Sequence, residues 1–323
     1  MKKNDFYCTL RGAFFLSSLH CINDSRVLDP ACGSGNFLII FYKELRRIEI
    51  EILKKIDLLQ KKGQNQGAWF YESSVSLNNF YGIEIDDFAH EVARLSLWIA
   101  EHQMNVEMEK ALFNFKASLL PLRDAGQIFV GNSLRVDLAD LLNKKSYEEL
   151  YIIGNPPYIG SRLQNSNQKK DLEFAVTAQY KWTQMDYIAG WFFKVKDFLR
   201  DYNCRASFVA TNSIFQGEQV SYIWKPLLQE IDIIFAYKNI KWNNNASKNA
   251  GVSVSIVGLA GCNQYKRKKF IFDIEGHREE VNYISAYLSA NNRIIVDSTR
   301  KSIFGLPPLD NGNQPIKFGI ITL

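Results

Sequence analysis

The sequence predicts an α/β fold with a doubly wound, seven-stranded and mostly parallel sheet. Seven β-rich segments alternate with helical patterns, and they lie near residues 26–29, 80–85, 128–131, 150–154, 205–211, 231–236 and 252–259. Such alternation is typical of parallel strands that are joined by helical crossovers. The last two segments have no helix between them, which predicts an antiparallel final hairpin. A chain of 323 residues with 46% apolar residues is long enough to bury a full core.

Three helices are predicted between these strands. The first runs from about residue 37 to 61 and ends in the polar, Gly-containing stretch 61–67, which we interpret as a surface loop. The second begins after Asp86 or Asp87, either of which is a suitable N-cap, and carries on one face Phe88, Val92, Leu95 and Ile99. We expect this apolar face to pack inward, so that the charged residues face water. The third helix carries at regular spacing Met185, Ile188, Phe192, Val195 and Phe198.

Charge and cysteine content exclude several classes of protein. A net charge of +5 and a pI near 8.8 permit a polyanionic partner without requiring one. The densest basic cluster, Lys266 to Lys269, is either a contact to phosphates or a solvated turn. Five cysteines without a Cys-x-x-Cys pair or a histidine cluster predict a reduced, cytoplasmic protein with no disulfide and no bound metal. The lack of a long apolar run or a signal-peptide pattern argues against membrane insertion and export.

A Pro-rich motif, Asn155-Pro156-Pro157-Tyr158, directly follows the fourth predicted strand. An exocyclic amine on an aromatic ring is a poor nucleophile, and two fixed hydrogen-bond acceptors would draw its nitrogen toward tetrahedral geometry. The Asn155 side-chain oxygen and the Pro156 carbonyl can be these acceptors, because the two prolines fix φ. Tyr158 would then stack on the ring. The alternative is a strand that ends in an ordinary Pro-rich turn.

A Gly-rich turn between the first strand and the first helix predicts a site for a nucleotide-like cofactor. Gly33 and Gly35 allow close approach of the backbone to a ligand, and the next helix begins there. A dinucleotide site is the competitor, but its fingerprint needs a third glycine where Leu38 stands and an acid about 20 residues later. Here the next acid at a strand end is Glu84, which could take both hydroxyls of a ribose. A nucleoside cofactor without phosphates, such as S-adenosylmethionine, fits this pattern. Alternatively, Asp29 caps a helix and Glu84 is a solvated strand end.

The predicted site residues share one position relative to their strands. Asp29 follows the first strand, Glu84 ends the second, Asn132 follows the third and Asn155 follows the fourth. The carboxyl ends of parallel strands meet at one edge of a sheet, where open α/β folds bind ligands. We therefore expect these four side chains to form one site.

Taken together, the motifs resemble those of the γ-class DNA adenine-N6 methyltransferases. The resemblance rests on Asp29-Pro-Ala-Cys-Gly-Ser-Gly35, Gly82-Ile-Glu-Ile-Asp86 and Asn155-Pro-Pro-Tyr158, in this order. Segments 154–163, 186–191, 210–219 and 241–245 are similar to the methyltransferase core of the single-chain, MmeI-like restriction-modification enzymes. The resemblance covers roughly residues 20–320 and implies the class I S-adenosylmethionine-dependent methyltransferase fold. It also implies that residues 26–262 are the catalytic domain, 1–25 a shortened lead-in, and 263–323 a connector toward a target-recognition region that the chain lacks.

The resemblance implies a role for each matching position. Asp29, Ala31, Gly33 and Gly35 would shape the loop around the methionine part of S-adenosyl-L-methionine, and Glu84 would hold its ribose. Ile85 would pack on the adenine of the cofactor, and Asn132 would lie near its amino group. Asn155, Pro156, Pro157 and Tyr158 would be catalytic, with Trp242 as a second stacking surface on a loop or, alternatively, as an anchor of that loop.

Three hypotheses follow for function. The first is a methyltransferase that modifies N6 of a flipped-out adenine in duplex DNA, as part of a restriction-modification system and with a separate target-recognition or nuclease subunit. The second is a fragment that binds cofactor or DNA without turnover. The third is a methyltransferase for another planar amine or amide, such as protein glutamine or ribosomal guanine. Cytosine N4 is a variant of the first, since the same acceptors serve either amine.

Overall fold

The structure is a computed structural model, and it describes residues 17–62, 72–112, 115, 126–142, 149–177, 180–242, 252–262, 264–265, 268–290 and 294–297. Its strands are β1 (Ser25–Asp29), β2 (Phe80–Glu84), β3 (Gln127–Val130), β4 (Glu149–Gly154), β5 (Cys204–Thr211), β6 (Ile231–Trp242), β7 (Val252–Gly261), β8 (Lys269–Phe272) and β9 (Arg278–Val281). Residues 17–24 are helical, and the other helices of eight residues or more in the described part are α2 (Asn36–Lys62), α3 (Asp87–Ala111), α5 (Ser166–Val176) and α6 (Ala189–Asp201). Shorter helical segments are η1 (Leu77–Asn79), α4 (Leu138–Leu141), η2 (Trp182–Gln184), η3 (Asn212–Phe215), α7 (Gly217–Gln219), η4 (Val220–Trp224) and α8 (Lys225–Leu227).

The described strands form one nine-stranded sheet in the order β3-β2-β1-β4-β5-β7-β6-β8-β9. Strands β1 to β5 pair in parallel, whereas β7 is antiparallel to both β5 and β6. The predicted α/β fold with a mostly parallel sheet and an antiparallel final hairpin is therefore confirmed. The strand count is corrected from seven to nine, because β8 pairs with β6 and β9 pairs with β8. The sheet thus continues beyond residue 262.

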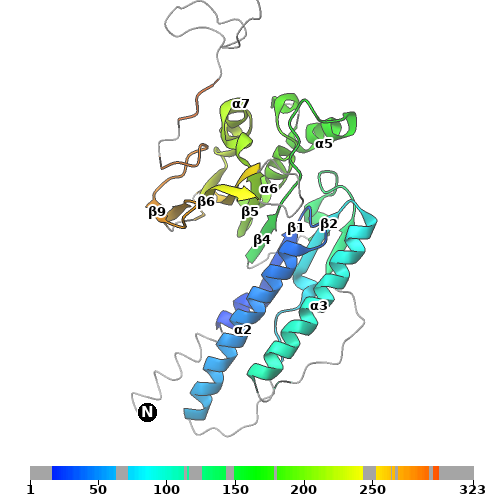
Figure 1. The fold of residues 1–323 in the computed structure, drawn as a ribbon, viewed down its shortest axis with the longest axis vertical. Coiled ribbons are helices and arrows are strands. Elements are labelled where there is room, and N and C mark those ends of the chain that lie inside the picture. The colour runs from blue at the N-terminus through cyan, green and yellow to red at the C-terminus, as the bar shows by residue number, and fades with distance from the viewer. Residues whose placement is uncertain are drawn as a thin grey trace, which may run out of the picture.

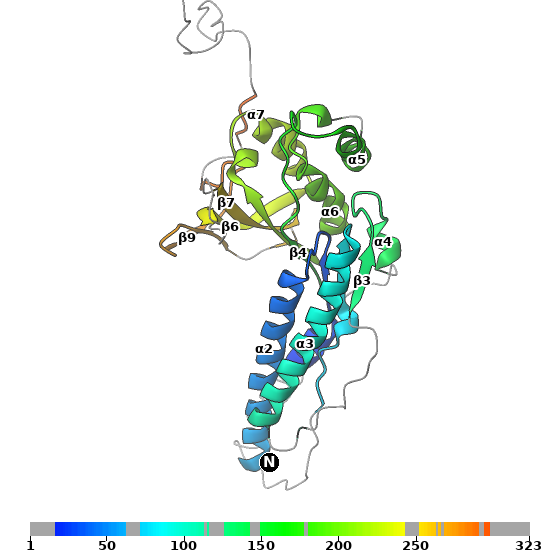
Figure 2. The same cartoon turned by 45° about the vertical axis from the view of Figure 1, so that its right-hand side comes forward.

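Helices cover both faces of the sheet, and alternate residues of β1 point to the two faces. Val27 packs in a cluster with residues of α2 and α3, while Leu28 packs in a second cluster with Phe192 and Val195 of α6. Figures 1 and 2 show α2 and α3 side by side along one face and α6 on the other. Helix α5 lies beyond the carboxyl ends of the strands (Figure 1).

The prediction for the inward face of α3 is wrong. Asp86 is the N-cap, as predicted, and its side chain accepts a hydrogen bond from the Ala89 backbone N–H. However, the predicted buried face is on the outside, since Phe88, Leu95 and Ile99 are 79%, 55% and 49% exposed. The buried residues of α3 are Ala93, Leu97, Ala100, Met104 and Met108. Small side chains on this face allow close packing, and a Cβ added to Gly35 would lie 3.2 Å from the Ala93 Cβ.

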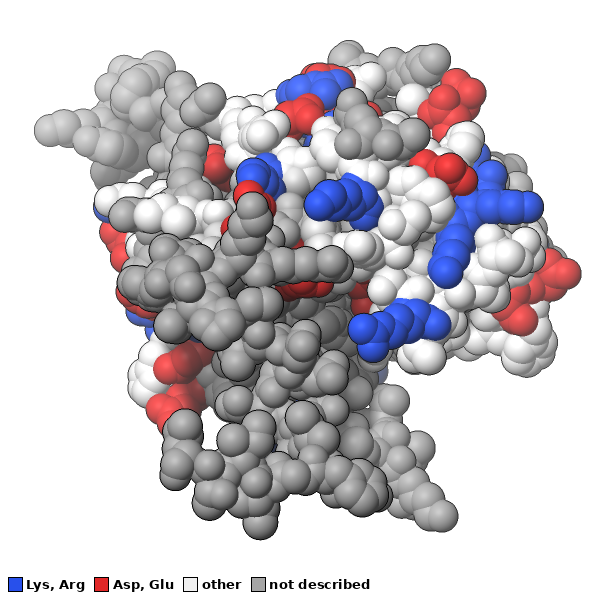
Figure 3. All heavy atoms as spheres, turned by 90° about the horizontal axis from the view of Figure 1, so that it is seen from above, with Lys and Arg blue, Asp and Glu red and all other residues white. Residues whose placement is uncertain are grey.

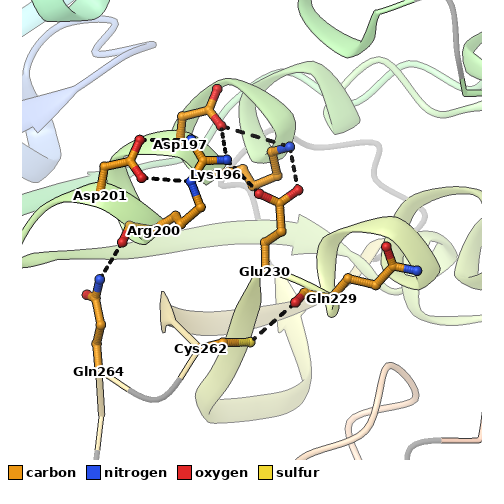
Figure 4. A network of polar contacts seen from close by, with 8 residues as sticks. All are labelled: Lys196, Asp197, Arg200, Asp201, Gln229, Glu230, Cys262 and Gln264. Carbon is orange, nitrogen blue, oxygen red and sulfur yellow. Dashed lines mark hydrogen bonds and ion pairs between the residues drawn. The ribbon is translucent and has the colours of Figure 1, made fainter.

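A polar network fixes the end of α6 that is remote from α5 (Figure 4). Glu230 accepts hydrogen bonds from Lys196 Nζ and Arg200 Nη1, both at 2.7 Å, and Gln264 Nε2 donates to the Arg200 carbonyl oxygen at 2.6 Å. These contacts join α6 to the segments that flank β6 and β7. The network lies away from the carboxyl ends of β1 to β4, so it is structural.

Candidate active site

A cavity of about 780 Å³ lies at the carboxyl ends of β1 to β4 and beneath α5. Its walls come from the turn after β1 (Pro30, Ala31, Gly33), the end of β2 (Ile83, Glu84, Ile85), the segment after β3 (Gly131, Asn132, Ser133, Arg135), the segment after β4 (Asn155, Pro157, Ile159), α5 with the residue before it (Asn165, Asn167, Gln168, Asp171), and the start of α6 (Tyr187, Trp191). The volume is in the range of small-molecule sites. The predicted convergence of strand ends is thus a property of the structure.

The turn after β1 is held against the end of β2. The Gly33 backbone N–H donates to Glu84 Oε2 at 2.8 Å, and the Cys32 N–H donates to the Ile83 carbonyl at 3.0 Å. Gly33 and Gly35 have φ values of +52° and +84°, which L side chains rarely adopt. Gly33 lines the cavity, whereas Gly35 packs against α3. The turn is therefore built before any ligand arrives.

Glu84 is anchored by backbone donors at the cavity wall. Its Oε1 accepts hydrogen bonds from the backbone N–H groups of Ile85 at 2.9 Å and of Asp86 at 3.0 Å. Three donors hold the carboxylate, and about one of its four acceptor positions is left for a ligand. Ile85 lines the same wall and is 69% exposed, so it offers an apolar surface to a flat ring.

Asp29 lies behind the turn and does not line the cavity. Its side chain is fully buried, its Oδ1 accepts from the Ala31 N–H at 3.0 Å, and no described residue bonds to its Oδ2. Burial, reinforced by the charge of Glu84, raises the pKa of Asp29 to about 7. Gly154 makes this position possible, because a Cβ there would lie 2.6 Å from Asp29 Oδ1.

The Pro-rich motif enters the cavity from the end of β4. Asn155 lines the cavity, its Oδ1 is buried, and no described group donates a hydrogen bond to it. Pro157 also lines the cavity, while Pro156 is buried. Tyr158 is 36% exposed and is not a wall residue. A buried oxygen without a donor is costly, and among the described side chains with such an oxygen only Asn155 lines the cavity, where the N–H of a ligand could reach it.

The segment after the motif is pinned by Asp186. Its Oδ1 accepts from the Ile159 N–H at 3.0 Å and the Ile188 N–H at 3.1 Å, and its own N–H donates to Gln219 Oε1 at 2.9 Å. Burial raises the pKa of Asp186. Gln164 Nε2 adds a hydrogen bond of 2.9 Å to the Ile159 carbonyl. Residues from segments 186–191 and 210–219 thus support the backbone just after Tyr158.

Asn132 lines the cavity and is paired with an acid that our motif analysis did not identify. Asn132 Nδ2 donates to Asp171 Oδ2 at 2.8 Å, and Arg135 Nε and the Tyr187 hydroxyl donate to the same carboxylate at 2.7 and 3.1 Å. Asp171 lies on the inward side of α5 with Leu172. In the sequence, the sign that Asp171 lies in the site was its place on the apolar side of a helix, but acids on helices are usually solvated.

Two further predictions concern residues near the limits of the described chain. Trp242 is the last residue of β6 and its backbone pairs with Val252, so it ends a strand and does not lie on the predicted loop. Its side chain and residues 243–250 are outside the described part of the chain. In the predicted basic cluster, Lys266 and Arg267 are also outside it, whereas Lys269 is buried and lies 3.2 Å from Asp232 Oδ2. Lys269 is therefore neither a phosphate contact nor part of a solvated turn.

Comparisons with known proteins agree on one family. The family model of the DNA-methyltransferase domain of MmeI matches residues 13–273. DNA methyltransferase A of Bacillus subtilis (strain 168) is 45% identical over 295 residues, which are 91% of this chain and 33% of that protein. A putative type II restriction enzyme and methyltransferase of Methanocaldococcus jannaschii is 44% identical over 75 residues, or 23% of this chain and 6% of that protein.

A solved structure supports the same relationship. The structure of the type IIL restriction-modification enzyme MmeI in complex with DNA matches with a TM-score of 0.81 and 33% identity, over 92% of this chain and 39% of that chain. This chain therefore spans between a third and two fifths of the length of its long relatives. None of the helices in the described residues is long and apolar enough to cross a membrane.

Proposed function

We propose a reaction for this chain from its family: the chain belongs to the MmeI DNA-methyltransferase family, as the resemblance in its motifs predicts. The proposed reaction is transfer of a methyl group to N6 of an adenine that has been swung out of duplex DNA. The observation that carries the proposal is Asn155 Oδ1, a buried acceptor in the cavity wall to which no described group donates.

The acceptor fits an exocyclic amine because such a group brings the missing N–H donor. Asn155 would accept one hydrogen bond and the Pro156 carbonyl a second, which draws the nitrogen out of conjugation with its ring. Asp186 holds the backbone directly after the motif, so the acceptor is positioned before substrate binds. Holding the amine in the right orientation contributes much of the rate for a reaction that forms no covalent enzyme intermediate.

The opposite wall fits S-adenosyl-L-methionine, which supplies the methyl group when bound. The turn at Ala31 and Gly33 presents backbone at close range, and Glu84 keeps one acceptor position for a ribose hydroxyl. Ile85 offers an apolar face for the adenine ring, and Asn132 lies on the next strand end. Asp29 and Gly35 shape this turn from behind and would not touch the ligand.

Extruding a base from duplex DNA costs a few kcal/mol, and stacking on an aromatic side chain returns about 1–3 kcal/mol per contact. We assign one such contact to Tyr158, which is partly exposed beside the cavity. Trp242 at the end of β6 remains a proposed second contact. Figure 3 looks down on the end of the molecule that carries α5 and α7, and it shows both Lys or Arg and Asp or Glu side chains among uncharged residues.

The partners of this chain are also proposals, since the chain corresponds to only part of its relatives' length. We propose that duplex DNA is the substrate and that target recognition and nuclease activity come from regions or subunits outside this sequence. Residues 26–262 remain our proposed catalytic domain, with 1–25 as a lead-in and 263–323 as a connector, of which β8 and β9 extend the sheet.

Transfer of tritium from labelled cofactor to genomic DNA of a methylation-deficient host tests the proposal. Asn155→Ala is expected to lower the transfer rate by about 10²–10³-fold, the usual effect of losing one fixed hydrogen-bonding group. Binding of S-adenosylhomocysteine is expected to change only a few-fold. Asn78→Ala, an exposed asparagine before β2, is the matched control and should have wild-type activity.

Four outcomes would contradict the proposal in different ways. Equal rates of methyl transfer by wild type and Asn155→Ala would show that the motif has no catalytic role. Cofactor binding without transfer, even with the neighbouring gene products added, would favour a binding fragment. Mass spectrometry of the modified nucleoside separates N6-methyladenine from N4-methylcytosine, and labelled protein or ribosomal RNA with unlabelled DNA would indicate another substrate.

A further inference from the structure

Asp171 on α5 is the centre of a charged cluster that the proposed reaction does not use. The residue is 8% exposed and lines the cavity. Its carboxylate accepts hydrogen bonds from Asn132 Nδ2 at 2.8 Å, Arg135 Nε at 2.7 Å and the Tyr187 hydroxyl at 3.1 Å. Burial of a carboxylate is costly unless it is paired and hydrogen-bonded, as Asp171 is.

The cluster fixes the orientation of the Asn132 amide. Its Oδ1 accepts from the Leu134 backbone N–H at 3.0 Å, while its Nδ2 donates to Asp171. The two ends of the amide are therefore distinguished by their partners. Nδ2 is therefore the donor end of the amide in the cavity wall, and the carboxylate of Asp171, which can accept about four hydrogen bonds, keeps one acceptor position.

A donor beside an acceptor complements one edge of adenine, where N1 accepts and the N6 amino group donates. We propose that Asp171, together with Asn132, reads this edge of the adenine ring of the cofactor, and that Asp171 is a specificity-determining residue for the adenosyl group. This inference rests on the proposed function. It adds a contact from α5 to the wall formed by the strand ends.

Sheet order assigns this contact to the cofactor and not to the target base. Gly131, next to Asn132, donates its N–H to the Glu84 carbonyl at 2.7 Å, so the cluster adjoins the proposed ribose site. Strands β3 and β4 are separated by β2 and β1, which puts their ends about 14 Å apart at 4.7–4.9 Å per strand. A purine ring held by Asn155 after β4 would not reach Asn132.

Arg135 keeps the acid in place. Its guanidinium lies over the ring of Phe174, 5.3 Å from the centroid, while its Nε bonds to Asp171. Lys194 Nζ lies 5.7 Å from the same ring and donates to the Leu134 carbonyl at 3.2 Å. Arg135 thus holds the Asp171 carboxylate in place, and Lys194 supports the same ring of Phe174.

Calorimetry with the full chain, without DNA, tests the inference by measuring its affinity for two forms of the demethylated cofactor. S-adenosylhomocysteine carries adenine, and its inosine analogue carries hypoxanthine, in which N1 donates and O6 accepts. Wild type is expected to prefer the adenosyl compound. Asp171→Asn is expected to weaken adenosyl binding roughly 10- to 100-fold, the range for one hydrogen bond to a charged group, and to weaken inosyl binding much less. Asp137→Asn, which alters the exposed N-cap of α4, should keep the wild-type ratio.

The ratio of the two affinities separates recognition from a structural role. Equal weakening of both compounds, or a lower melting temperature with an unchanged ratio, would overturn the inference. If Asp171→Asn kept the wild-type ratio of affinities but changed the preference for adenine over cytosine as the methylated base, the cluster would contact the target base. That result would also overturn the inference. Failure of wild type to bind either compound would contradict the proposed function itself. An unchanged ratio with normal transfer to DNA leaves that function intact and rejects only the role of Asp171.

Discussion

Replacing Asp29 with asparagine should remove a pH dependence from the stability of this protein. The carboxyl group is fully buried, one oxygen accepts from the Ala31 N–H, and Glu84 lies close enough to repel its charge. These conditions raise the pKa of Asp29 from 3.8 to about 7, with burial as the main cause. Asparagine keeps an oxygen for the Ala31 N–H and cannot ionise.

The direction of the pH dependence follows from which state, folded or unfolded, binds the Asp29 proton. Between pH 4 and 7 the unfolded chain loses the Asp29 proton while the folded chain retains it, so the folded state binds more protons and stability falls as pH rises. The contribution is fully present below about pH 4 and is lost as pH rises through about 7. A pKa change from 3.8 to about 7 corresponds to on the order of 4 kcal/mol, at 1.36 kcal/mol per pKa unit.

Urea denaturation, followed by tryptophan fluorescence at pH values from 4.5 to 8, measures this effect. The free energy of unfolding of wild type should fall more steeply with pH than that of Asp29→Asn. Asp86→Asn is the matched control, because the Asp86 carboxylate is an exposed N-cap. Parallel pH curves for wild type and Asp29→Asn would refute the reasoning, as would an equal loss of slope in Asp86→Asn.

Substitutions at two other positions test a support of the site, Asp186, and the structural network at Glu230. Asp186→Ala deprives the backbone N–H groups of Ile159 and Ile188 of their acceptor, so we expect a loss of about 2–3 kcal/mol in the free energy of unfolding and slower methyl transfer. Asp186→Asn retains the oxygen and should restore both, and failure to do so would reject hydrogen bonding as its role. Glu230→Gln should cost about 1 kcal/mol at pH 7. The hydrogen bond from Lys196 lowers the pKa of Glu230, so its contribution is present above the unfolded value near 4.5 and fades as pH falls below it; an equal cost at pH 3.5 would contradict this.

Local signals in the sequence were sufficient where a backbone conformation depends on nearby residues. Gly33 and Gly35 have the positive φ values that a Gly-rich turn predicts, and Asp86 is the N-cap of α3. The order of strands and acids along the chain also predicted which side chains meet, because parallel strands bring their carboxyl ends to one edge. Glu84, Asn132 and Asn155 accordingly line one cavity.

Packing partners could not be deduced in the same way. Helix α3 carries apolar residues on two sides, and periodicity favoured the side of Phe88, which is exposed. The side with Ala93 is buried, because small side chains fit against the turn at Gly35. Choosing between two such faces requires the shape of the neighbouring surface, which is absent from a linear pattern.

The order of residues along the chain was enough to specify the class of fold, the Gly-rich turn after β1 and the position of Asn155 at the end of β4. Folding in three dimensions was needed to bring Asp171 from α5 against Asn132, to bury Asp29 behind Gly154 and to extend the sheet with β8 and β9. The physical reason is the distance along the chain between the residues that interact. Turns, caps and strand ends are encoded by neighbours within a few residues, whereas the environment of a buried charge is set by segments that are distant along the chain and meet only when the core has formed.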